Sequence, residues 1–184
     1  MKRNIFIVIL LASAVSLLGA ACGSSSDSDS ATASSSMATT PPIPDELSGW
    51  VGSLCDAITP SANALVAASK AAEASGSTSD ITTVLTSTSA LLTAVSREMV
   101  SLGAPPIDGG AVMVAEYPKG IAQAVATVNS AAASVQNGSI SSMDQIGSID
   151  VDSSLSPEAT KAWSEIESAM GDVPKCQTLK DTLS

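Results

Sequence analysis

Three cysteines are the residues of this chain with the most distinctive chemistry: Cys22, Cys55 and Cys176. A thiol can carry a lipid, pair in a disulfide or bind a metal ion. The 184 residues include no histidine, so the commonest general base and the commonest transition-metal ligand are missing. Two cysteines without a histidine make an incomplete zinc site. The sequence therefore favours attachment and structural roles for its thiols, and it indicates neither a metal nor a cofactor.

The first 21 residues have the composition of an export signal. Lys2 and Arg3 form a positively charged start, residues 5–18 are apolar except for two serines, and residues 19–21 are small. This order is typical of a secretory signal peptide. The apolar run has about 14 residues, fewer than the roughly 20 that a membrane-spanning helix needs. We therefore expect residues 1–21 to be a signal peptide.

A cysteine directly after the small residues makes this signal more specific, because it resembles the lipobox of bacterial lipoproteins. The resemblance covers residues 1–22, and it departs from the usual pattern at Gly19, where a leucine is expected and Leu18 lies one position too early. It implies that the sulfur of Cys22 receives diacylglycerol and that Cys22 becomes the first residue of the mature protein. The expected location is the cell membrane, with the anchored protein facing the extracellular or periplasmic side. The alternative is an ordinary secretory signal cut near Ala21, which would leave Cys22 as a free thiol.

Cys55 and Cys176 remain, one near each end of the rest of the chain. In an oxidising compartment such an isolated pair is expected to form a disulfide. Closing so long a loop contributes roughly 4–5 kcal/mol in the chain-entropy model. Joint ligation of a metal ion is the alternative, and the lack of histidine argues against it.

The charge of the mature chain excludes one large class of partners. Removing Lys2 and Arg3 with the signal leaves 6 basic against 18 acidic residues, a net charge of −12. Such a protein is repelled by nucleic acid and by anionic lipid, so we expect no nucleic-acid binding. Solubility is the simpler explanation of the acidity, and a basic partner surface is the other.

Composition divides the mature chain into two parts. Residues 22–44 are rich in serine, threonine and proline, and they bury too little apolar surface to offset the entropy of ordering, so we expect a lipid-anchored flexible tether. Residues 45–184 provide enough chain for one domain with its own core.

Apolar residues recur at helical spacing through this domain. The expected helices cover residues 45–75, 81–102, 108–136 and 157–170, with a further short helix within 174–183. Asp80 is the expected N-cap of the second helix and Ser156 that of the fourth. Pro118 is expected to kink the third helix. Pro60 is expected either to kink the first helix or to divide it into two abutting helices, the second with Thr59 as its N-cap. Short or moderate connections favour an all-α fold, an antiparallel four-helix bundle with kinked helices that is stapled by one disulfide.

The domain contains three aromatic residues, Trp50, Tyr117 and Trp163. Both tryptophans lie on apolar stripes, so core packing is the simpler interpretation. The alternative is that the three rings line one end of the bundle as a small apolar ligand site. In that case the protein is a carrier or sensor that holds a small apolar molecule between its helices.

The pattern of Trp50, Cys55, residues 102–106, Gly110 and Cys176 resembles small secreted helical proteins of actinobacteria that have no assigned function, and it implies no activity. No phosphate-binding loop or nucleophile motif occurs. The scattered glutamates, Glu98, Glu116, Glu165 and Glu167 among them, are interpreted as solvated charges. The sequence thus favours a non-catalytic cell-surface lipoprotein with a protein partner in the envelope or host, and it names no catalytic residue.

Overall fold

The computed structural model describes residues 43–142, 145 and 155–183, and these residues contain helices and no strands. By internal contacts the chain divides into two units, Met1–Ile43 and Pro44–Ser184. The helices described here belong to the second unit. They are α2 (Asp45–Ser75), α3 (Thr78–Leu102), α4 (Gly110–Gln136), α6 (Pro157–Asp172) and α7 (Pro174–Leu183). The expected all-helical fold is confirmed.

Helix α2 begins and ends where the sequence indicates. Asp45 and Glu46 lie in its first turn, where the partial positive charge of the helix terminus favours carboxylates. Gly76 ends the helix with a φ of 62°, a left-handed conformation that glycine adopts without strain. The helix continues through Pro60 as one element. In the turn before this proline the hydroxyl of Thr59 donates to the carbonyl of Cys55 at 2.6 Å.

The N-cap expected for α3 was wrong, because the helix begins one turn earlier. Ser77 is the N-cap, and its hydroxyl oxygen accepts a hydrogen bond from the backbone N–H of Asp80 at 3.1 Å. The Ser77 hydroxyl in turn donates to the Asp80 carboxylate at 2.7 Å, and Ser75 donates to the same carboxylate. The hydrogen bonds from Ser75 and Ser77 lower the pKa of Asp80. Asp80, the third residue of the helix, thus exchanges two hydrogen bonds with the hydroxyl of its N-cap, Ser77.

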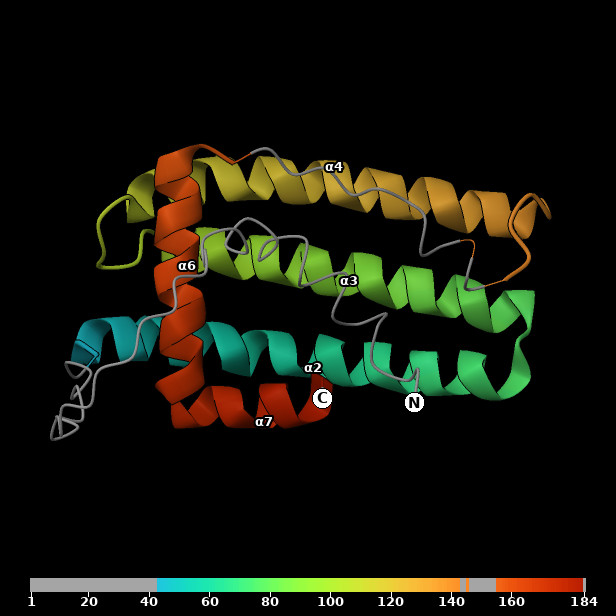
Figure 1. Ribbon diagram of the computed structural model, residues 1–184, viewed down its shortest axis with the longest axis horizontal. Coiled ribbons are helices and arrows are strands. Elements are labelled where there is room, and N and C mark those ends of the chain that lie inside the picture. Colours follow the sequence, from blue (N-terminus) through green and yellow to red (C-terminus); the bar gives the residue numbers. More distant parts are fainter. Residues whose placement is uncertain (1–42, 143–144, 146–154, 184) are drawn as a thin grey trace, which may run out of the picture. The chain divides into compact units, whose positions relative to one another are not determined.

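Three long helices form the body of the domain. Figure 1 shows α2, α3 and α4 side by side with alternating directions, and α3 contacts both of the others. Helix α6 contacts α4 and α2 and runs across the direction of the three at one end. Helix α7 then turns back and lies beside α2. The N-terminus of α2, the C-terminus of α3 and the N-terminus of α4 therefore meet at the end that α6 covers.

The hydrophobic core contains side chains of α6 as well as of the three long helices. The largest fully buried side chains include Leu54 of α2, Ile81 and Met99 of α3, Met113 of α4 and Ile166 of α6. The apolar face of α3 is buried in the first turns of the helix, whereas Leu92, further along, is only partly buried. Each long helix and α6 therefore contributes at least one side chain to the core.

The caps of the later helices follow the sequence closely. Ser156 caps α6, with its hydroxyl accepting from the backbone N–H of Ala159, and Pro157 occupies the first turn as expected. Gly110 begins α4 where the chain leaves its proline turn. A Cβ atom at Gly110 would lie 2.4 Å from the carbonyl oxygen of Pro105, so this close approach requires glycine.

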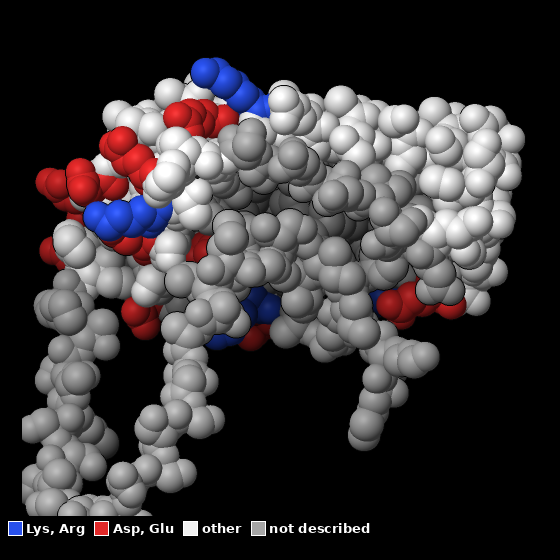
Figure 2. All heavy atoms as spheres, turned by 45° about the horizontal axis from the view of Figure 1, so that its top comes forward, with Lys and Arg blue, Asp and Glu red and all other residues white. Residues whose placement is uncertain are grey.

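Charged residues are distributed unevenly over the domain. Helix α4 carries no charged residue after Lys119, although it continues to Gln136. Figure 2 shows acidic and basic side chains near the end where α6 lies, further ones along the lower edge of the view, and a surface without charge at the upper right. Charged groups and aromatic rings thus occur together at the α6 end.

Candidate functional site

The predicted disulfide joins α2 to α7. Cys55 and Cys176 have sulfurs 2.03 Å apart and Cα atoms 5.2 Å apart. Both residues are buried, at 0% and 3% exposure, and the Sγ of Cys176 also lies 3.8 Å from the carbonyl oxygen of Val51. The bridge therefore fixes the last helix to the first, and these two sulfurs do not act as metal ligands.

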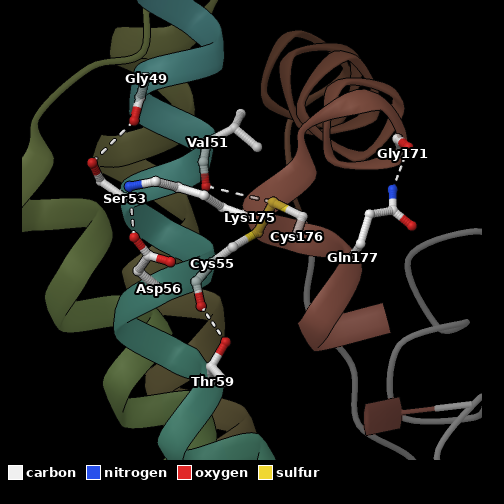
Figure 3. Close-up of a disulfide and its surroundings, with 10 residues drawn as sticks. All are labelled: Gly49, Val51, Ser53, Cys55, Asp56, Thr59, Gly171, Lys175, Cys176 and Gln177. Atoms are coloured by element: carbon white, nitrogen blue, oxygen red, sulfur yellow. Dashed lines mark hydrogen bonds and ion pairs between the residues drawn. A yellow bond between two sulfur atoms is a disulfide. The ribbon is translucent and has the colours of Figure 1, made fainter. Parts of the chain in front are cut away.

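Polar contacts reinforce the same junction between α2 and α7, as Figure 3 shows. Lys175, next to the disulfide, forms an ion pair with Asp56 at 2.7 Å. Gln177 donates to the carbonyl of Gly171 at 2.8 Å and so ties α7 to the end of α6. These contacts lie at the surface, and exposed ion pairs stabilise proteins by about 1 kcal/mol or less. The junction is consequently a structural staple.

Two of the three predicted aromatic residues lie together. The rings of Tyr117 on α4 and Trp163 on α6 are stacked, with centroids 4.5 Å apart and planes inclined by 28°. The indole N–H of Trp163 donates to a carboxylate oxygen of Glu167 at 2.8 Å, one helical turn further along α6. This group of Tyr117, Trp163 and Glu167, called the crossing cluster below, lies at the contact between α4 and α6.

Trp50 occupies a separate position at the same end of the domain. Its indole N–H donates to the carbonyl oxygen of Gly103 at 3.0 Å, which links α2 to the C-terminus of α3. Trp50 is buried at 8% exposure, as is Trp163. Among the described residues, a stacking contact between aromatic rings is made by Tyr117 and Trp163. The structure thus brings two of the three rings into contact, and it uses both indole N–H groups internally.

Burial controls the acid–base properties of the crossing cluster. Burial, followed by the negative charge of Glu167, raises the pKa of Tyr117 well above its usual range. Burial also raises the pKa of Glu167, and the hydrogen bond from Trp163 opposes that shift in part. The cluster therefore disfavours a second negative charge and takes up a proton on Glu167 more readily than a solvated glutamate does.

Glu116 has a role that the sequence reasoning missed. Its carboxylate on α4 accepts a hydrogen bond from the backbone N–H of Ser156, the N-cap of α6, at 2.9 Å. Hydrogen bonding from Ser156 lowers the pKa of Glu116. No local sequence signal predicts this contact, because its two partners lie 40 positions apart. Glu116 thus anchors the start of the crossing helix.

Within the described residues the structure contains no group of three or more metal-ligating side chains. No helix in that part of the chain is long and apolar enough to cross a membrane. Cys22 and the predicted signal and tether up to residue 42 lie outside the described residues. Comparison with protein-family models, with curated proteins and with solved structures found no match.

Proposed function

We propose that this protein is a non-catalytic lipoprotein whose helical domain is held at the outer side of a cell membrane through Cys22. The observation that carries the proposal is the buried Cys55–Cys176 disulfide. A stable structural disulfide is typical of proteins that fold outside the reducing cytosol. It agrees with the export signal and lipobox pattern that the sequence predicts at residues 1–22.

Replacement of the lipid-accepting sulfur tests the anchor. In a bacterial host that processes lipoproteins, the Cys22→Ser variant should lose incorporation of labelled fatty acid and move from the detergent phase to the aqueous phase on phase separation. Ser25→Ala, three residues away, is the matched control and should keep both properties. Equal labelling and partitioning of Cys22→Ser and wild type would refute lipid attachment at this residue.

We further propose that the domain binds another protein of the envelope or host. The support is chemical: the mature chain is strongly acidic, its described residues offer no metal cluster, and its buried polar groups serve internal contacts. Crosslinking of the anchored protein in its native envelope, followed by mass spectrometry, should identify one recurrent partner. The partner should be absent when the soluble Cys22→Ser variant is crosslinked, and recovery of abundant proteins in proportion to their amount would contradict specific binding.

A carrier of small apolar molecules is the second candidate, and the stacked pair of Tyr117 and Trp163 is the observation that favours it. Stacking rings at a helix crossing are suited to flat apolar ligands. A ligand between α4 and α6 should change the emission of Trp163 in a saturable manner, and Tyr117→Leu should weaken that response. Emission that stays constant across a panel of apolar ligands would exclude this candidate.

We also propose a finer description of the fold, an antiparallel four-helix bundle with kinks. The alternating directions of α2, α3 and α4 support it, as do the prolines within α2 and α4. The transverse course of α6 in Figure 1 instead favours a layer of three helices that a fourth crosses. Interhelical distances measured between spin labels on α3 and α6 would distinguish the two descriptions.

A further inference from the structure

Two glutamates at the contact between α4 and α6 have opposite requirements for charge. Glu116 on α4 holds the N-cap of α6 by accepting from the N–H of Ser156 at 2.9 Å. Glu167 on α6 belongs to the crossing cluster and accepts from the indole N–H of Trp163 at 2.8 Å. Glu116 thus attaches the start of α6 to α4, whereas Glu167 lies on α6 beside the stacked rings through which the helix contacts α4.

Glu116 performs its role best when it is ionised. An ionised carboxylate accepts a stronger hydrogen bond than a neutral carboxyl group does, and the lowered pKa of Glu116 expresses this preference. A group whose pKa is lower in the folded state stabilises that state above its unfolded pKa. This contribution is lost as the pH falls through the folded pKa. Acid therefore releases the N-terminal anchor of α6.

Glu167 fits its surroundings best when it is neutral. It is partly buried beside the stacked rings of Tyr117 and Trp163, and no Lys or Arg of the described chain forms an ion pair with it. Burial without a cation disfavours the charged form, in accord with the raised pKa of this group. A group whose pKa is higher in the folded state stabilises it at low pH, and this contribution is lost as the pH rises through the folded pKa.

Charged residues other than Glu116 and Glu167 also lie on α6 and on the helices that pack against it, and several of them form ion pairs. On α6 itself, Lys161 forms ion pairs with Asp108 and Glu165, at 3.5 and 3.7 Å. On α7, Lys175 is paired with Asp56 of α2. The packing elements also carry these titratable and charged residues: Asp45, Glu46, Lys70 and Glu73 of α2, Tyr117 and Lys119 of α4, and Lys180 and Asp181 of α7. Of these, Tyr117 is close enough to Glu167 for the negative charge of Glu167 to raise the Tyr117 pKa, and Lys119 lies close enough to favour the charged form of Glu116.

We propose that α6 is a pH-sensitive element, attached to α4 most tightly at mildly acidic pH, where Glu116 is ionised and Glu167 is neutral. The attachment weakens in stronger acid, because Glu116 loses its charge and with it the strong bond to Ser156. It weakens again toward alkaline pH, because Glu167 becomes charged beside the rings of the crossing cluster. The maximum lies between the lowered pKa of Glu116 and the raised pKa of Glu167. This inference is independent of the lipid anchor and of any partner.

Hydrogen exchange followed by mass spectrometry tests the proposal on the full chain in detergent, between about pH 3.5 and pH 8. After correction for the intrinsic pH dependence of exchange, protection of peptides from α6 relative to α3 should pass through a maximum. Glu167→Gln should remove the decline on the alkaline side, and Glu116→Gln should remove the decline on the acidic side. We expect each limb to span roughly fivefold in protection. On the acidic side this is the difference between a charged and a neutral hydrogen bond to Ser156. On the alkaline side it is the cost of a partly buried charge on Glu167, which the hydrogen bond from Trp163 offsets in part.

Glu165→Gln is the matched control, because this residue is on α6 but pairs with Lys161 at the surface; it should keep both limbs. Carbon-13 NMR titration of the Glu167 carboxyl in the wild type provides a readout that requires no variant. A midpoint at or below the ordinary glutamate value would overturn the proposal. So would α6 protection that changes in one direction only and is the same in wild type and Glu167→Gln.

Discussion

Removal of the disulfide is the perturbation whose magnitude the structure predicts most directly. The bridge between Cys55 and Cys176 closes a loop of 121 residues. For such a loop, the chain-entropy model gives a loss of about 5 kcal/mol when the constraint on the unfolded chain is removed. The total free energy of unfolding of a single domain is about 5–15 kcal/mol. The Cys55→Ala/Cys176→Ala variant should therefore be partly unfolded or close to it at room temperature.

Urea denaturation of the oxidised protein and the double variant, followed by circular dichroism, measures this difference. The wild type should show one cooperative transition, and the variant should have a much lower midpoint and a somewhat larger denaturant dependence, because its unfolded chain is more expanded. Asp56→Ala is the matched control: it removes the neighbouring ion pair with Lys175 and should cost about 1 kcal/mol or less. A loss below about 1 kcal/mol in the double variant would refute the view that this bridge is the main staple of the domain.

Three further substitutions probe the core, a helix cap and a close approach. Ile166→Ala removes a fully buried side chain of α6 and should cost about 2–5 kcal/mol in urea denaturation; a cost below about 1 kcal/mol would place this face outside the core. Ser77→Ala removes the N-cap of α3 and should cost about 1 kcal/mol, whereas an unchanged thermal midpoint would mean that the cap contributes nothing. Gly110→Ala places a Cβ atom 2.4 Å from the carbonyl oxygen of Pro105 and should destabilise by about 1–3 kcal/mol. Gly171→Ala is the matched control, because a Cβ atom at Gly171 would meet open space. Equal losses of stability in the two variants would contradict the close approach at Gly110.

The sequence predicted those features that short-range patterns encode. Helical spacing and capping residues placed the boundaries of the helices, including the stop at Gly76 and the start of α6 after Ser156. The two cysteines left after Cys22 predicted the disulfide. The cap of α3 was misplaced because Asp80 is a good N-cap by type, and a serine three residues earlier forms a reciprocal cap with it. Two good candidates within one turn are distinguished by the backbone conformation.

Apart from the disulfide, contacts between residues that are distant in the chain were beyond the reach of the sequence. Glu116 and Glu167 were interpreted as solvated charges, yet one anchors Ser156 and the other accepts from Trp163 beside Tyr117. Their environment depends on α6 lying across the ends of the long helices, and an amphipathic pattern reports which face of a helix is buried without reporting its crossing angle. The electrostatics of this end of the domain therefore follow from the tertiary arrangement alone.

The helix with the lowest intrinsic helix propensity, α3, lies between the other two long helices. Helix α3 contains 11 serine and threonine residues among 25, and β-branched and hydroxyl side chains are weak helix formers. Helices α2 and α4 contain 8 alanines each, the residue with the highest helix propensity. The weakest former lies between the other two and contacts both, so packing on two sides compensates for its propensity. The threonine hydroxyls of α3 donate to carbonyls four residues earlier at 2.8–3.0 Å, so they compete little for other partners: Thr82, Thr83, Thr86, Thr88 and Thr93.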